Sequence, residues 1–263
     1  MSVIKIIVAT HKQFVMPQDK ELYLPIHVGC EGKKDLGFQG DNTGDNISVL
    51  NPYYCELTGL YWAWKNLECD YLGLVHYRRY FTKKAGSYND SINIDAVILD
   101  KDDIEKMLEV SNVIVSKKRK YYIETLYSHY AHTLDGSHLD LARKMIEQKT
   151  PEYLASFDKV MKQRSGYMFN MFIMKKELAD DYFTWLFPIL DSMYECMDLS
   201  DSTPFEARLF GRVSELLFNV WLVKNNLTPT EAHFMYMEKV NLLKKGLSFL
   251  QAKFLGKKYG KSF

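Results

Sequence analysis

Cysteine is scarce in this sequence, and long hydrophobic runs are missing. The 263 residues include four cysteines, none in a CxxC pair and none spaced from a histidine as in a zinc site. We therefore expect free thiols, as in a reducing cytoplasm. No stretch approaches the roughly 18 consecutive apolar residues of a membrane-spanning helix. The apolar run that follows Met1 is also shorter than that of a signal peptide.

Three common catalytic signatures are absent as well. No GxGxxG follows the first apolar run and no GxSxG occurs, which argues against a nicotinamide-type Rossmann domain and an α/β-hydrolase. The C-terminal string GKKYGKSF is not a phosphate-binding loop, because position 255, where the first glycine belongs, is leucine. The chemistry must therefore be sought in less standard groupings.

The composition is that of a globular protein whose charge is unevenly spread. Hydrophobic residues make up 47% and charged residues 25%, which excludes a disordered chain. The net charge is +1, yet the stretch from Lys239 onward holds seven lysines and no acid. The sequence therefore predicts a domain over residues 1–238 and a basic tail over 239–263. Because only the tail is basic and no RNA-binding signature appears, we expect no nucleic-acid partner.

The tail has the pattern of an amphipathic helix. Apolar side chains recur at helical spacing at Val240, Leu243, Leu247, Leu250 and Phe254. A basic amphipathic helix of this kind is typical of a segment that lies on an anionic membrane surface. The alternative is a C-terminal helix that folds back on the acidic body of the protein.

Apolar runs alternate with helical periods along the first 236 residues. Strands are predicted at 3–9, 23–28, 70–76, 113–116, 167–174 and 232–236. Helices are predicted at 52–66, 104–110, 138–149, 177–193 and 213–224. The alternation indicates an α/β, Rossmann-like domain with a mostly parallel central sheet.

Polar and basic side chains follow two of the predicted strands. They are Thr10, His11 and Lys12 after the first, and His76, Tyr77, Arg78 and Arg79 after the strand at 70–76. Ligands of parallel α/β sheets bind beyond the carboxyl ends of the strands, and guanidinium groups bind phosphate in bidentate fashion. We therefore expect these residues to share an anion site. The alternative is that one of the two arginines pairs with a carboxylate inside the fold.

Four longer strings resemble a bacterial domain family of formerly unknown function. They read ELTGLYWAWKN, YLGLVHYRRYF, MFNMFIMKKELADDYFTWLFPIL and RLFGRVSELLFNVWL, and the resemblance covers roughly residues 3–236. HYRRYF is the most specific of these marks. Family members are found among the assembly enzymes of capsules, exopolysaccharides and lipopolysaccharides.

The resemblance implies a GT-A-like glycosyltransferase, with galactofuranosyl transfer among the family's activities. It implies a UDP-sugar donor, with galactofuranose or galactose as the candidate sugars, and a lipid-linked surface-glycan acceptor. The protein would then work in the bacterial cytoplasm, peripherally on the inner face of the membrane. The alternative is a non-catalytic nucleotide-sugar or glycan-binding module.

The sequence departs from the GT-A pattern at one place. Where GT-A enzymes carry an Asp-x-Asp that holds a metal, this chain has His76-Tyr77-Arg78. Histidine is a metal ligand, but arginine is not, and its charge can replace a metal at the diphosphate. The departure puts dependence on Mn²⁺ or Mg²⁺ in doubt.

The general base implied by the resemblance is Glu215, near the start of the last long helix. An inverting transfer needs one carboxylate to take the proton of the acceptor hydroxyl. The alternative is an acid in the first helical turn that complements the helix dipole. Asp135 is the reserve candidate, with an Asp-Gly turn as its alternative.

Two further groupings are weaker. Asp45 and Asn46 would contact uracil or ribose, unless they only form a turn. Three histidines (His129, His132 and His138) lie within ten residues, as metal ligands or, more simply, as loop and cap donors.

Overall fold

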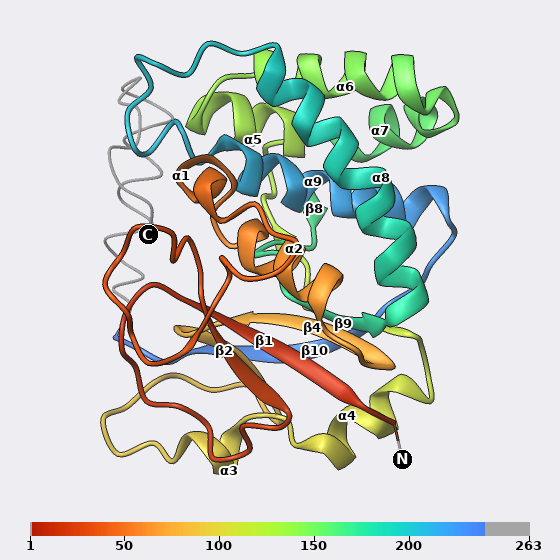
Figure 1. Ribbon diagram of the computed structural model, residues 1–263. Helices are drawn as coiled ribbons and strands as arrows, with labels where there is room; N and C mark the ends of the chain where they lie inside the picture. The colour runs from red at the N-terminus through yellow and green to blue at the C-terminus, as the bar shows by residue number, and fades with distance from the viewer. Residues whose placement is uncertain (1, 240–263) are drawn as a thin grey trace.

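A computed structural model describes residues 2–239 of the chain. The predicted tail at 239–263 therefore lies, except for its first residue, outside the described residues. One large sheet has helices on both of its faces (Figure 1). Within residues 2–239, no helix combines the length and hydrophobicity that crossing a bilayer requires.

The sheet has eight strands in the order β3-β2-β1-β4-β5-β10-β6-β9, and β9 also pairs with β4. Their bounds are β1 Ile4–Thr10, β2 Tyr23–His27, β3 Gln39–Gly40, β4 Tyr71–His76, β5 Arg79–Thr82, β6 Val113–Ser116, β9 Phe172–Lys175 and β10 Thr230–Tyr236. β1 runs parallel to β2 and β4, and β6 runs parallel to β10. β9 runs antiparallel to β4 and β6, and β5 runs antiparallel to β4 and β10.

The prediction of a mostly parallel sheet is therefore wrong, because β5 and β9 run antiparallel to their neighbours and make the sheet mixed. Only Tyr77 and Arg78 separate β4 from β5. A connection of two residues can only reverse the chain, because a parallel crossover needs about a dozen residues or more. The strings that predict strands say nothing of this direction.

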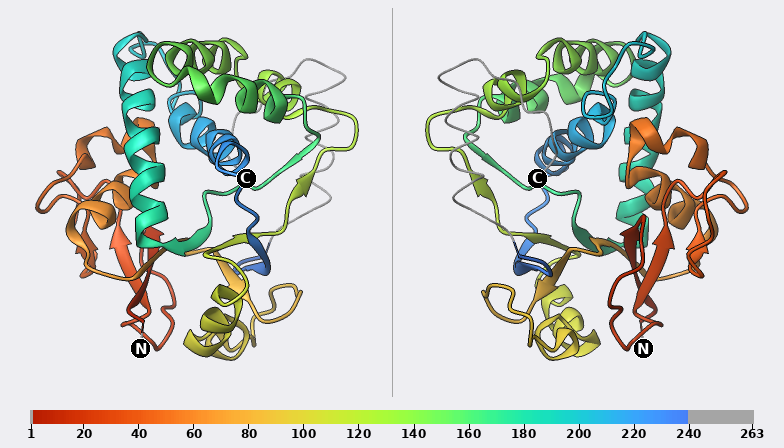
Figure 2. Two further views of the ribbon diagram at one scale, coloured as in Figure 1. Left: turned by 90° about the vertical axis from the view of Figure 1, so that its right-hand side faces the viewer. Right: turned by 90° about the vertical axis from the view of Figure 1, so that its left-hand side faces the viewer.

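The helices cover both faces of the sheet unequally. Their bounds are α1 Asn51–Tyr54, α2 Leu57–Asn66, α3 Ile94–Val97, α4 Lys101–Leu108, α5 Leu126–Thr133, α6 Ser137–Lys149, α7 Leu154–Met161, α8 Lys176–Glu195 and α9 Leu209–Lys224. α3 and α4 lie below the sheet in Figure 1, and the other labelled helices lie above it. Figure 2 shows the same three layers from the two sides. A separate two-stranded sheet, β7 Arg119–Lys120 with β8 Ser165–Gly166, lies at one edge.

Alternation along β1 explains the two hydrophobic cores. Ile7 and Ala9 belong to the core between the sheet and the large helical layer, while Ile6 and Val8 belong to the core between the sheet and the α3 and α4 side. Successive side chains of a strand point to opposite faces, so a strand that is apolar throughout must be covered on both sides.

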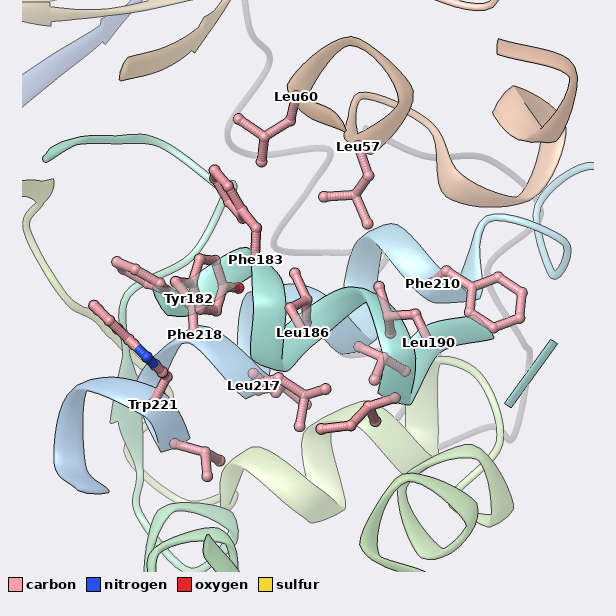
Figure 3. Packing of buried hydrophobic residues seen from close by; sticks show 14 of the residues in the cluster. Leu57, Leu60, Tyr182, Phe183, Leu186, Leu190, Phe210, Leu217, Phe218 and Trp221 are labelled. Atoms are coloured by element: carbon pink, nitrogen blue, oxygen red, sulfur yellow. The ribbon is translucent and has the colours of Figure 1, made fainter. Parts of the chain in front are cut away.

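α8 and α9 form the centre of the helical layer. Figure 3 shows Phe183 of α8 directed toward Leu60 of α2, while Tyr182 lies beside Phe218 and Trp221 of α9. The ring of Tyr182 is 5.2 Å, between centroids, from each of those two rings. These buried aromatic contacts hold α9, and with it the residues of its other face, in a fixed position above the sheet.

Among the predicted helices whose bounds differ in the structure, two bear on the site. The helix expected over 52–66 is broken at Cys55 into α1 and α2. The helix expected from 213 begins at Leu209. Both differences change the environment of a residue in the site described next.

Candidate active site

A cavity of about 940 Å³ lies beyond the carboxyl ends of β1 and β4. Its walls come from these strand ends, the α1–α2 junction, residues 199–208 and one face of α9. Of the donor-site and catalytic residues predicted from the sequence, those that line it are His11, His76, Tyr77, Arg78, Arg79 and Glu215. The structure thus brings the two strand ends and the candidate base to one place.

The ends of β1 and β4 meet because the strands are parallel neighbours, with Ala9 opposite His76. His11 then packs edge-on against Tyr77, with 5.3 Å between ring centroids. Lys12 lies over the same ring at 5.0 Å but is not among the described lining residues. Thr10 is buried, and its hydroxyl donates to the carbonyl of Lys12 at 2.6 Å. It therefore shapes the turn at the end of β1.

The two adjacent arginines have different surroundings. Nη1 of Arg78 lies 3.3 Å from Oε1 of Glu238. The Arg79 guanidinium lies between the rings of Phe169, at 4.6 Å, and Tyr236, at 5.7 Å. Its Nε is buried and has no hydrogen-bond partner among residues 2–239. A buried donor without a partner is costly, so Arg79 is the better placed of the two to receive an anionic ligand.

A turn with an uncommon backbone joins three walls of the cavity. Phe169 and Asn170 both have positive φ, 79° and 52°. Asn170 donates through Nδ2 to Oε1 of Glu56 and to the carbonyl of Gly211, both at 2.9 Å. Its Oδ1 accepts from the Ser214 hydroxyl at 3.1 Å. Such conformations cost on the order of 1–3 kcal/mol each and persist where the surroundings hold them.

Two carboxylates contact this turn: Glu56 accepts from Asn170, and Glu215 accepts from the backbone of Phe169. Burial, and then the negative charge of Glu56, raise the pKa of Glu215 to about 7, although a backbone hydrogen bond from Phe169 and the charges of Arg79 and Arg212 act in the opposite direction. Glu215 is the seventh residue of α9, so the alternative of an acid in the first helical turn is wrong. A carboxyl that titrates near neutrality suits proton transfer.

His76 at the end of β4 is neutral. Burial, followed by the charge of Arg79, lowers the pKa of His76 to about 4. Its Nε2 lies 2.6 Å from the carbonyl oxygen of Phe169, so this nitrogen carries the proton and donates it. Two arginines stand next to it, and residues 2–239 contain no group of three or more histidine, cysteine or acidic side chains arranged to hold a metal. This donor set does not fit a divalent cation.

Three charged residues of the site were not predicted from the sequence. Arg212 lies about one turn before Glu215 on α9, and Arg208, the N-cap of that helix, lies about two turns before it, so their helical spacing was a usable signal. Glu56 comes from the α1–α2 junction, and no pattern in the sequence marks it. Together they make the cavity a mixture of a carboxylate pair and several guanidinium groups.

A family profile described as a domain of unknown function (DUF4422) matches residues 5–226. The chain belongs to this family. No curated protein matches the chain. A solved structure described as the apo form of the bifunctional glycosyltransferase WbbM is similar, with a TM-score of 0.82 and 30% sequence identity. The match covers 90% of this chain and 45% of that one, so the chain spans less than half of that protein.

The predicted likeness to glycosyltransferases is therefore confirmed at a general level. That HYRRYF marks the family, and that galactofuranose is the sugar, stay predictions.

Other predicted residues of this DUF4422 chain lie elsewhere or make local contacts. Asp45 accepts from the Tyr61 hydroxyl at 3.1 Å, and Asn46 donates to the carbonyl of Gly44 at 3.0 Å. Asp135 accepts from the backbone amide of Ser137 at 2.9 Å. None of the three is among the described residues that line the cavity. The turn alternatives fit these contacts.

The three clustered histidines also have local partners. Nδ1 of His129 and Nδ1 of His132 lie 2.9 and 2.8 Å from the two oxygens of the buried Glu124. Nδ1 of His138 lies 3.1 Å from the Tyr130 hydroxyl. The three do not converge on one point, and His129 alone of them lines the cavity.

Cys55 gives a testable case of backbone strain in this site. Its φ of 55° and ψ of −130° lie in a region that glycine adopts far more readily than residues with a Cβ. Its Sγ lies 3.3 Å from Nε of Arg208. We expect Cys55→Gly to be more stable than Cys55→Ala by about 1 kcal/mol, because both lose the thiol but only glycine relieves the strain. Urea denaturation of both variants measures the difference, and an alanine variant at least as stable as the glycine variant would contradict it.

Proposed function

We propose that this chain is a glycosyltransferase that uses a nucleotide-sugar donor. One observation carries the proposal: Glu215, with a pKa of about 7, shares a cavity with Arg79, whose Nε has no hydrogen-bond partner within residues 2–239. The likeness to a bifunctional glycosyltransferase supports the same reading. A volume of about 940 Å³ also falls in the range of sites for ligands of this size.

The donor diphosphate lies, in this proposal, at the ends of β1 and β4. Arg79 and Arg78 bind its oxygens, and His11 and Tyr77 form the adjoining wall. Because guanidinium keeps its charge when partly buried, these arginines stabilise the negative charge that develops on the leaving nucleotide. No step in this proposal needs a metal.

Glu215 acts as the general base of an inverting transfer. Its carboxylate takes the proton of the acceptor hydroxyl as that oxygen attacks the anomeric carbon and the nucleoside diphosphate leaves on the opposite face. Burial, with the charge of Glu56 in second place, keeps the pKa of Glu215 near neutrality. Asn170 holds Glu56 in place.

The finer assignments belong to the same proposal. The donor is a UDP-sugar, galactofuranose or galactose, and the acceptor is a lipid-linked surface glycan. The catalytic domain is residues 1–238, and the basic tail at 239–263 keeps it on the cytoplasmic face of the bacterial membrane.

Donor screening tests the proposal. The purified full chain is mixed with a panel of nucleotide sugars, with EDTA or with added Mn²⁺, and its melting temperature and nucleotide release are measured. We expect one UDP-sugar to stabilise the fold by about 2.7 kcal/mol at 100 times its Kd, and to be hydrolysed slowly in EDTA. Stabilisation without nucleotide release, even with a glycan acceptor, would indicate a binding module. No stabilisation by any nucleotide sugar would overturn the donor assignment.

A further inference from the structure

A projecting segment next to the cavity combines exposed apolar and basic side chains. Tyr122 is 77% exposed and Ile123 is 64% exposed. Exposed cations lie in the same segment and just before its partner strand β8: Lys117, Lys118, Arg119, Lys120, Lys162 and Arg164. We call residues 117–123, with Lys162 and Arg164, the basic tip. Figure 2 shows the yellow-green segment between β6 and α5 at the edge of the molecule.

Pairing with β8 and hydrogen bonds to Arg164 hold the basic tip in place. β7 pairs with β8, and the amide of Tyr121 donates to the carbonyl of Arg164 at 2.8 Å. Nη1 of Arg164 donates to the carbonyl of Tyr122 at 3.1 Å. Tyr121 itself is buried. The two apolar side chains are therefore presented by an ordered turn.

The backbone of the tip is strained in a way that exposes its apolar residues. Tyr122 has a φ of 58°, which is unusual for a bulky side chain. The next residue, Ile123, also points to solvent, although burying such a side chain would stabilise the protein. Strain together with exposed apolar surface indicates a contact made outside the described chain.

We propose that the basic tip docks on an anionic lipid membrane. Tyr122 and Ile123 enter the headgroup layer, and the surrounding lysines and arginines bind lipid phosphates. Residues 117–123 contain no acid, so the charge of the tip is not offset within it. This site is separate from the predicted tail at 239–263.

The cavity explains why a membrane contact here would be useful. Arg119 of the tip and His129 of α5 both line the cavity. A docked tip therefore places the rim of the cavity at the lipid surface, where a lipid-linked acceptor would enter. This reason rests on the proposed function, whereas the docking itself rests only on the surface.

Charge disfavours the chain's own tail as the occupant. Residues 240–263 carry six lysines and no acid, and they repel a basic surface. A soluble anionic glycan matches the charge but leaves Tyr122 and Ile123 without a role. It therefore serves as an alternative outcome of the test.

Vesicle sedimentation of the full chain tests the docking. The vesicles are phosphatidylcholine with or without phosphatidylglycerol. Reversing three lysines of the tip (Lys117→Glu, Lys118→Glu and Lys120→Glu) should weaken binding to the anionic vesicles at least about tenfold. The control reverses three exposed lysines elsewhere, Lys20, Lys84 and Lys106, and should bind nearly as the parent does. Equal binding by the tip variant and the control would overturn the proposal.

A second variant reports on the apolar pair. In the Tyr122→Trp variant, lipids brominated in their acyl chains should quench the fluorescence of the new tryptophan. In a separate variant, Tyr122→Ala together with Ile123→Ala should weaken vesicle binding. The control, Val110→Ala at another exposed apolar site, should bind vesicles as the parent does. The proposal would be overturned if the tryptophan were not quenched and the lysine reversals weakened binding to a soluble anionic polysaccharide as much as binding to vesicles. That result would assign the tip to glycans. Vesicle binding needs no turnover, so a chain that docks but transfers no sugar would refute the proposed function alone.

Discussion

Replacing Glu215 with glutamine should remove most sugar transfer and leave donor affinity unchanged. Glutamine has the shape of the carboxyl but cannot take a proton, so we expect kcat to fall by a factor of about 10²–10⁴. Turnover and the Kd for UDP, measured on the same preparation, separate chemistry from binding. Asp135→Asn is the matched control, because Asp135 accepts from a turn amide and does not line the cavity. Activity of Glu215→Gln within a few-fold of the parent, with loss in Asp135→Asn, would transfer the role to Asp135.

The same carboxyl should set the pH dependence of the enzyme. The carboxylate is the active form, so turnover of the parent should rise with pH through about 7 and level off above it. The control is the Glu215→Gln variant, whose residual turnover should lack this rise. A parent profile that is flat between pH 6 and 8 would contradict the role of Glu215.

The free energy of unfolding should fall as the pH rises, in contrast to the turnover. The pKa of Glu215 is about 7 in the folded chain against 4.5 ordinarily, so its ionisation destabilises the fold as the pH rises from 4.5 to 7. Glu215→Gln should therefore stabilise the fold by about 3 kcal/mol at pH 8, because the shift costs about 1.4 kcal/mol per pH unit. The gain should shrink toward pH 5, and urea denaturation at the two pH values measures it.

Replacing Arg79 with methionine should weaken UDP binding by about 10–100-fold. The loss corresponds to about 1.5–3 kcal/mol, the usual scale of a hydrogen bond to a charged group. Methionine suits the space between the rings of Phe169 and Tyr236, and burial lowers the pKa of Arg79, so the fold should survive the loss of this charge.

Isothermal titration with UDP measures this effect against two comparisons. Arg143→Met removes a guanidinium that pairs with Asp158 and does not line the cavity, so its affinity should not change. Arg78→Ala should weaken binding on the same scale of about 1.5–3 kcal/mol. If Arg79→Met unfolds more readily but binds UDP as the parent does, Arg79 is a structural residue.

Much of the fold could be predicted because its signals are local. Ile6, Ile7 and Val8 form an apolar β-branched run, and such a run is a buried strand wherever the chain ends up. The helical period over 177–193 is equally local, and the structure confirms the helix as α8. The antiparallel direction of β5 and β9 has no such local signal. It depends on the length of the connections and on which strand edge is still open.

The candidate site divides in the same way. The sequence by itself indicated that His11 and Arg79 follow predicted strands, and the structure then brings those strand ends together by pairing β1 with β4 in parallel. The resemblance of its sequence string predicted Glu215 as the base, but the string does not show whether its pKa suits that role. Its pKa depends on burial and on the charge of Glu56, which lies 159 positions earlier in the chain. Only the tertiary structure decides this, because burial and electrostatic interaction act through space and depend on where the turn at Phe169 and Asn170 holds α9 against the α1–α2 junction.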